Sequence, residues 1–207
     1  MLCKLKLFQL SLFLFFIFIY SATLAGDSLM LKVHFIYGSK PKKEFKKTEH
    51  KIFGGIHGGH VYVETNNEII SFGTNNGAWH IFPHKNKTAG KYRLDKNLNW
   101  HNDTAKQQLT TVYIPITPQQ YVAFKIAEKK YFECTPYDYA FIGMRCAAGG
   151  YDMLMKAGIC KKKKRFGIIT TNFYPKRLRI KLLHRAIKEK WLVTKTEGRN
   201  TRIWESD

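Results

Sequence analysis

Cys146 and His60 are the two residues whose types and surroundings point most directly to chemistry. Cys146 follows Arg145 and precedes the small residues 147–150, and this pattern predicts a helix over residues 146–157 that begins at the cysteine. A helix N-terminus and an adjacent cation both favour thiolate over thiol, which activates the sulfur as a nucleophile. The alternative is a structural cysteine, because free cysteines are among the most buried residue types.

His60 supplies the second group that thiol chemistry needs. A cysteine nucleophile requires a general base, and an imidazole is the usual choice. His60 follows Gly58-Gly59 and opens the strand-like run 60–65, so its ring has room beside the chain. The sequence therefore favours a pair in which Cys146 is the nucleophile and His60 is the base.

A hairpin after His60 predicts two candidates for orienting its ring. The pair Asn66-Asn67 separates run 60–65 from a second strand-like run, and Asn tolerates the positive φ angles of tight turns. Alternate residues of a strand share a face, so Glu64 lies on the His60 face and the hairpin register brings Ser71 there too. Ser71 is the closer of the two in this register. For Glu64 the alternative is a solvated strand residue.

A metal site is the competing interpretation of the histidines. His57 and His60 are spaced as His-x-x-His, with His80 and His84 further along, and imidazole suits zinc. The spacing lacks the helical context of the metalloprotease signature, and no acidic pair stands beside it. We therefore predict neither a metal nor a cofactor.

The surrounding elements predict an α+β fold. Strand-like patterns occupy residues 30–36, 60–65, 68–72, 78–82, 109–116 and 191–204, and helical patterns occupy residues 117–132, 146–157 and 175–191. Residues 38–47 and 83–108 are polar and irregular. We expect an antiparallel sheet of about five strands packed against the helix that carries Cys146. Tyr137-Asp138-Tyr139, on the connection before that helix, could wall a substrate groove or pack in the core.

The two motifs together resemble a known family. Gly-His-Val-Tyr-Val-Glu with its hairpin, and the distant Arg-Cys-Ala-Ala-Gly-Gly-Tyr-Asp-Met-Leu, resemble the circularly permuted NlpC/P60-type papain-like proteins, which include the lecithin:retinol acyltransferase-like proteins. The resemblance covers residues 50–160, with His60 before Cys146 as in the permuted set. It implies a permuted papain-like fold, the same nucleophile and base, and a third polar residue on the next strand. That residue is often His in the acyltransferase-like members, whereas Ser71 stands here, and Arg145 stands where many members carry Asn or Ser.

The N-terminal residues predict export. Lys4 and Lys6 precede an apolar run over residues 7–20, and small residues occupy 21–25. A basic start, a short apolar core and a small-residue site are typical of a signal peptide, here cleaved after Ala25. The alternative is an uncleaved anchor, because the uncharged stretch is about as long as a short membrane span.

Length and charge characterise the chain beyond the leader. Residues 26–207 are long enough for one domain with its own core, including a basic C-terminal helix and strand, and no Pro- or Ser-rich linker divides them. The chain has a net charge of +20, which favours anionic partners such as phospholipid or anionic glycan. Export makes nucleic acid the least expected partner. We expect the protein in the periplasm or outside the cell, with basic patches on an anionic envelope surface, either free or peripheral to a membrane.

Removal of the predicted signal peptide would leave an odd number of cysteines in the mature chain. Cleavage removes Cys3 and leaves Cys134, Cys146 and Cys160 in an oxidising compartment, so at least one thiol has no intramolecular partner. Cys146 and Cys160 are 14 residues apart, which in a continuous helix is about 21 Å and too far for a disulfide. Cys134 and Cys160 could form a disulfide, and that alternative stays open.

These observations predict an exported thiol-dependent hydrolase or acyltransferase. Its substrate would be an amide or an ester, with a cell-wall peptide amide as the first expectation and a lipid acyl group as the second. Backbone N–H groups at the start of the cysteine helix would hold the oxyanion. The alternative is a non-catalytic envelope binding protein on the same scaffold, attached to anionic surfaces through the cationic helix at 175–190.

Overall fold

The computed structural model describes residues 29–49, 58–66, 68–87, 89–95 and 107–207. The leader expected at residues 1–25 lies outside the described residues, as does His57. Within the described part, no helix is both long and apolar enough to cross a membrane.

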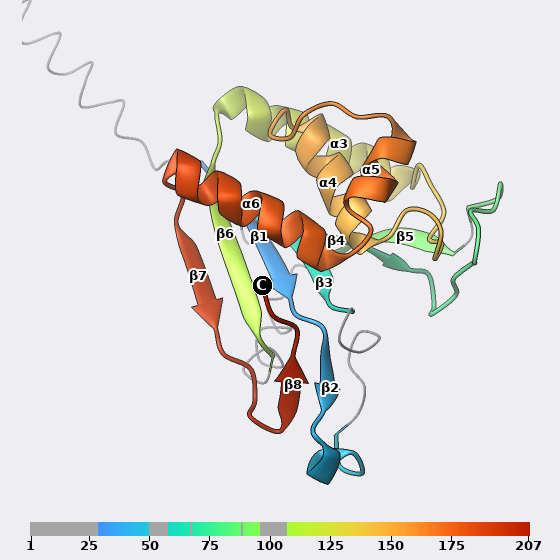
Figure 1. Cartoon of the computed structure of the whole chain (residues 1–207). Helices are drawn as coiled ribbons and strands as arrows, with labels where there is room; N and C mark the ends of the chain where they lie inside the picture. The colour runs from blue at the N-terminus through green and yellow to red at the C-terminus, as the bar shows by residue number, and fades with distance from the viewer. Residues whose placement is uncertain (1–28, 50–57, 67, 88, 96–106) are drawn as a thin grey trace, which may run out of the picture.

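A six-stranded sheet forms the centre of the fold, in the order β5-β4-β3-β1-β6-β7 (Figure 1). Its strands are β1 (Met30–Ile36), β3 (His60–Thr65), β4 (Glu68–Thr74), β5 (Gly90–Asp95), β6 (Leu109–Pro115) and β7 (Val193–Thr196). Every neighbouring pair is antiparallel. The central strand β1 therefore joins the β3–β4–β5 half, which carries His60, to the β6–β7 half.

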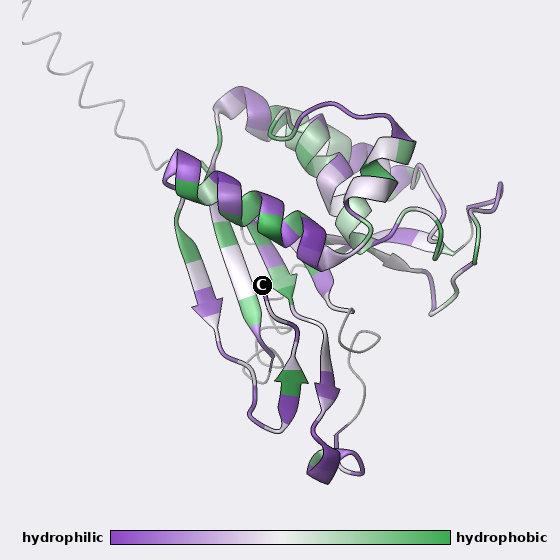
Figure 2. Cartoon of the chain, viewed as in Figure 1, coloured by the Kyte–Doolittle hydropathy of each residue, from purple (hydrophilic) through white to green (hydrophobic). Residues whose placement is uncertain are grey.

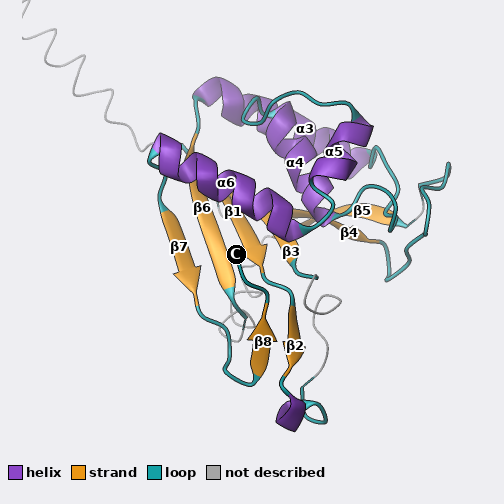
Figure 3. Cartoon of the chain, in the orientation of Figure 1, coloured by secondary structure: helices purple, strands orange, loops and turns teal. Residues whose placement is uncertain are grey.

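A short ribbon extends from one end of the sheet. It pairs β2 (Ser39–Pro41) with β8 (Arg202–Trp204), next to the 3-10 helix η1 (Lys43–Phe45). Figure 3 shows this ribbon and η1 at the end of the molecule away from the helices. Hydrogen bonds from Arg199 and Arg202 to the Glu49 carboxylate connect the two sides of the ribbon.

Four α-helices cover one face of the sheet (Figure 1). They are α3 (Pro118–Glu133), α4 (Cys146–Lys156), α5 (Arg165–Thr171) and α6 (Pro175–Glu189). Helix α3 begins where the sequence predicts, because Thr117 and Gln120 form a reciprocal capping box and Pro118 occupies the first turn. Helix α6 crosses β1 and β6, and Figure 2 shows polar and apolar residues alternating around it.

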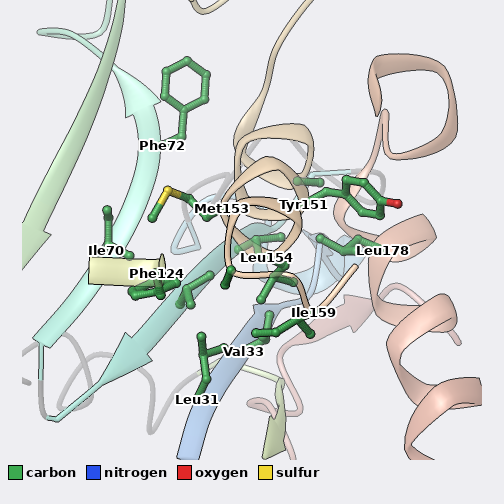
Figure 4. Close-up of a cluster of buried hydrophobic side chains, with 14 of the residues drawn as sticks. Leu31, Val33, Ile70, Phe72, Phe124, Tyr151, Met153, Leu154, Ile159 and Leu178 are labelled. Atoms are coloured by element: carbon green, nitrogen blue, oxygen red, sulfur yellow. The ribbon is translucent and has the colours of Figure 1, made fainter. Parts of the chain in front are cut away.

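One apolar core lies between the helices and the sheet. Alternate residues of β1 (Leu31, Val33 and Phe35) point into it, as the period of two in a strand requires. Figure 4 shows part of this cluster, in which side chains from the sheet meet those of α3, α4 and α6. Its labelled members are Leu31, Val33, Ile70, Phe72, Phe124, Tyr151, Met153, Leu154, Ile159 and Leu178.

Two glycines fix the position of α4 on the sheet. A Cβ at Gly149 would lie 2.7 Å from the Phe72 side chain, and one at Gly150 would lie 3.1 Å from Val61. Helix α4 can therefore lie directly against β3 and β4, and it contacts both strands. The close approach brings the first residue of α4, Cys146, to the start of β3.

The α+β class and the antiparallel sheet are confirmed, and most local predictions hold. The strand predicted at 30–36, the hairpin on either side of Asn66-Asn67 and the helices at 117–132, 146–157 and 175–191 all form, within a few residues at their ends. The sheet has six strands instead of about five.

The strand predicted at 78–82 is wrong. These residues form a loop joined to its neighbours by isolated bridges, and Trp79, Ile81 and Phe82 are exposed. The apolar run that suggests a strand therefore forms a surface loop instead of entering the sheet.

Candidate active site

The start of α4 and the start of β3 converge on one cavity of about 420 Å³. It is lined by Gly58, Gly59, His60, Thr74, Trp79, Tyr139, Phe141, Arg145, Cys146 and Pro175. The structure thus brings together the predicted nucleophile and base, which are 86 positions apart in the sequence. A cavity of this size matches a small-molecule or peptide-fragment site.

The Cys146 thiol is buried at the first position of α4, with 5% of the residue exposed. Burial raises the pKa of this thiol above its ordinary value. The Arg145 guanidinium and the backbone N–H groups of Val61, Ala147 and Cys146 act in the opposite direction. Because Val61 directly follows His60, its hydrogen bond places the sulfur against the first residues of β3.

His60 is the first residue of β3, and its ring lies 4.5 Å from the Tyr62 ring, measured between centroids. Desolvation lowers the pKa of His60 to about 4, and the nearby charge of Arg93 acts in the same direction. At neutral pH the imidazole is therefore uncharged and can accept a proton.

The two shifts together define the resting state. The raised thiol pKa and the lowered imidazole pKa both disfavour a thiolate–imidazolium pair between Cys146 and His60 at neutral pH. Attack by this sulfur would require His60 to take the thiol proton as the new bond forms. This is general-base chemistry, in contrast to a preformed ion pair.

Ser71 borders a second cavity, of about 440 Å³, which His60 also lines. This cavity is lined by His60, Tyr62, Ile69, Ser71, Gly73, Thr74, Arg93 and Tyr139. Ser71 therefore shares a cavity with His60 but not with Cys146. The β3–β4 ladder ends at Val63 and Ile70, one pair short of Tyr62 and Ser71, so the strand pairing stops before it reaches the ring.

Glu64 belongs to a different cluster, further along β3. Its two carboxylate oxygens bind Lys32 Nζ at 2.6 Å and His34 Nε2 at 2.8 Å. The residue is 3% exposed, so the interpretation of Glu64 as a solvated strand residue is wrong. Burial raises its pKa, but the hydrogen bonds from His34 and Lys32 outweigh this effect and lower it to about 2.

The three residues Tyr137-Asp138-Tyr139 lie in three different environments. Tyr139 lines both cavities, and Tyr137 is buried in the core. Asp138 binds His80 Nδ1 at 2.5 Å and accepts backbone N–H groups of His84 and Ala89. Among the described residues, no group of three or more His, Cys, Asp or Glu side chains is placed to hold a metal ion.

Arg145 is a site feature whose environment the sequence does not reveal. Its guanidinium lies over three aromatic rings, 5.3 Å from the Phe141 centroid, 4.9 Å from Phe173 and 5.4 Å from Tyr174. Two of these rings come from the segment before α6, which only the tertiary fold brings here. Thr74, Trp79 and Pro175 also enter the cavity wall without a sequence signal.

The three cysteines in the described part of the chain are all free thiols. Cys134 is exposed, and Cys160 is partly buried, which raises its pKa to about 11. The alternative of a bond between Cys134 and Cys160 is not realised in this structure. Cys146 shares its cavity with His60 of β3, whereas Cys160 shares a cavity with His184 of α6.

Comparisons with protein-family models, with curated proteins and with solved structures gave no match to this chain.

Proposed function

We propose that the protein is an exported thiol-dependent hydrolase or acyltransferase on a permuted papain-like scaffold, with Cys146 as nucleophile and His60 as base. The observation that carries this proposal is the shared cavity, which the thiol and the imidazole both line. The packing supports the permuted scaffold. The strand that carries His60 contacts the helix that carries Cys146, and His60 comes first in the chain, as in the permuted proteins.

The proposed reaction begins with the sulfur of Cys146 attacking the carbonyl carbon of an amide or ester. His60 removes the thiol proton as the S–C bond forms, and backbone N–H groups at the start of α4 stabilise the oxyanion. The C–N or C–O bond then breaks, and His60 returns the proton to the leaving group. Water, or another acceptor in a transfer reaction, attacks the thioester with His60 again as base and frees the sulfur.

Two substrate classes remain in order of preference. The expected export favours a cell-wall peptide amide first. A lipid ester or acyl chain is second, supported by the basic surface and by the exposed apolar residues Trp79 and Phe141 on the cavity wall.

The decisive experiment compares two cysteine variants on both substrate classes. The exported protein is incubated with peptidoglycan fragments and with phospholipid vesicles, and products are measured by mass spectrometry. We expect Cys146→Ala to reduce product formation about 10³-fold or more, since the nucleophile is lost. Cys134→Ala, which removes an exposed thiol, should leave the rate unchanged. Products that persist in Cys146→Ala would overturn the mechanism.

A non-catalytic envelope binding protein is the second candidate, and the resting state favours it. A thiol whose pKa is raised by burial is not activated on its own, and α6 presents Lys176, Arg177, Lys181, Arg185 and Lys188. Vesicle sedimentation with anionic and neutral lipid tests this second candidate. Salt-sensitive binding to anionic vesicles that Cys146→Ala retains, without any turnover by the unmodified protein, would support the binder.

A further inference from the structure

Within the described part of the chain, the Arg145 guanidinium is a positive charge without a carboxylate partner. Ion pairs among these residues join Arg179, Arg185, Arg199 and Arg202 to acidic side chains, but none involves Arg145. The described residues that line its cavity include no acidic side chain. The three rings around the guanidinium stabilise its charge without neutralising it.

Tyr139 connects Arg145 to the region around the Cys146 sulfur. Burial raises the pKa of Tyr139 to about 12 and the Cys146 thiol adds to this, whereas hydrogen bonding from Arg145 and from the Cys146 backbone N–H acts in the opposite direction. The Tyr139 hydroxyl oxygen is therefore close both to the Arg145 guanidinium and to the first backbone N–H of α4. The guanidinium and the helix N-terminus both give this position a positive potential, and the hydroxyl oxygen of Tyr139 already occupies part of it.

We propose that Arg145 is a substrate-recognition residue that binds an anionic oxygen group, a carboxylate or a phosphate, close to the carbonyl attacked by Cys146. This inference rests on the proposed function and narrows its substrate class. A planar guanidinium matches either group through paired hydrogen bonds. The guanidinium is partly buried and its Nη1 has no hydrogen-bond partner among the described residues, so one buried donor can bind an anion that enters the cavity.

Two alkylating reagents of nearly equal shape test this inference without the natural substrate. Iodoacetate and iodoacetamide differ in that one carries a carboxylate and the other a neutral amide. With either, the sulfur of Cys146 forms an S–C bond, the C–I bond breaks, iodide leaves, and the thiol proton passes to base. Peptide mass spectrometry gives the rate at each cysteine, so exposed Cys134 supplies an internal reference in the same sample.

The measured quantity is the iodoacetate-to-iodoacetamide rate ratio at Cys146 divided by the same ratio at Cys134. We expect a value of about ten in the unmodified protein, which corresponds to one charge-assisted hydrogen bond. Arg145→Gln should bring it to about one, and Arg145→Lys should retain part of the preference. Arg93→Gln is the matched control, because Arg93 lowers the pKa of His60 but does not line the Cys146 cavity. It should keep the full value.

The alkylation results distinguish a failure of the Arg145 inference from a failure of the proposed function. If Cys146 reacts but Arg145→Gln leaves the ratio unchanged, the inference fails and the thiol mechanism stands. If Cys146 reacts with neither reagent while Cys134 does, the sulfur is inaccessible and both fail. Thermal unfolding of each variant shows that a lost preference does not come from a lost fold.

Protection against iodoacetamide distinguishes the two sources of the anion. N-acetylglycine offers a carboxylate next to an amide carbonyl, and inorganic phosphate offers a phosphate alone. Slower alkylation of Cys146 with N-acetylglycine supports a peptide carboxylate, and slower alkylation with phosphate supports a phosphorylated substrate. Protection by either that persists in Arg145→Gln would place the anion elsewhere and overturn the inference.

Discussion

Arg145, which is partly buried, and Arg179, which is fully buried, are two arginines with different electrostatic partners. Both lie over aromatic rings: Arg179 is 3.6 Å from the Tyr37 centroid, and Arg145 is 4.9 Å from its nearest centroid, Phe173. Arg179 also donates to Glu205 at 3.1 Å and to Asp207 at 2.8 Å. Arg145 has no such carboxylate among the described residues, and it lines a cavity.

The counter-ion is the informative difference between the two sites. Each guanidinium has an Nη1 that is buried and lacks a hydrogen-bond partner among the described residues, so an unsatisfied donor alone does not distinguish them. The ion pairs of Arg179 join α6 to Glu205 and Asp207, near the end of the chain. Arg145 instead lies beside the proposed nucleophile without a carboxylate, as we expect of a residue that binds an anionic ligand.

The largest expected effect is on stability, and it should fall on one arginine only. Arg179→Met leaves the buried Glu205 without its cation and leaves Asp207 with Lys195 alone, so we expect a loss of about 3 kcal/mol in the free energy of unfolding. Arg145→Met breaks no ion pair of the described residues and should cost about 1 kcal/mol or less. Urea denaturation followed by circular dichroism measures both. Equal losses would show that Arg145 is as structural as Arg179.

Acid should weaken the Arg179 side of the molecule. Burial raises the pKa of Asp207, but hydrogen bonds from Lys195, Tyr37 and Arg179 outweigh it and lower the value to about 2. A folded-state pKa below the unfolded one gives stability that is complete above about pH 4 and is lost as pH falls towards 2. We expect the Asp207 carboxyl to contribute about 1–2 kcal/mol to the free energy of unfolding, a value reduced because the side chain is partly exposed to solvent.

Urea denaturation at pH 5 and at pH 2.5 tests that expectation against Asp207→Asn. The variant should be the less stable protein at pH 5, and the difference should shrink at pH 2.5. Arg145→Gln should change stability by a similar amount at both pH values, because no described carboxylate depends on it. A pH-dependent effect of Arg145→Gln would reveal an acidic partner and weaken the contrast between the two arginines.

The sequence predicts what is local and misses what distant segments bring together. The capping box at Thr117 and the Asn-Asn turn are encoded within a few residues, so α3 and the β3–β4 hairpin can be predicted from them. Strand β5 is short, lies at the sheet edge and carries charged residues, which conceals the alternation of Tyr92 and Leu94. Helix α5 has only seven residues and begins at the end of a lysine run.

The same distinction applies to the candidate site. Cys146 and His60 can be selected from residue type, flanking small residues and predicted element starts. The true partners of Glu64 require the β1–β3 register, which sets Lys32 directly opposite it. The rings around Arg145 come partly from Phe173 and Tyr174, and no short-range pattern in the sequence links them to the cysteine.

The smallest expected effect concerns the thiol itself and sharpens the role of Arg145. Burial raises the pKa of Cys146 while Arg145 lowers it, so iodoacetamide alkylation of this thiol should rise with pH through pH 9 and show no plateau between pH 5 and 8. Arg145→Gln should slow the reaction about threefold at pH 8, as expected for one nearby charge in a partly polar setting.

Arg179→Lys is the matched comparison for this measurement, because it keeps a cation in the distant ion-pair network and should not alter Cys146. The rate at Cys134, measured in the same samples, corrects for differences in reagent and pH. A plateau from about pH 5 would instead reveal a preformed thiolate–imidazolium pair with His60. The base would then be charged before the substrate binds, and Arg145 would act on the substrate alone.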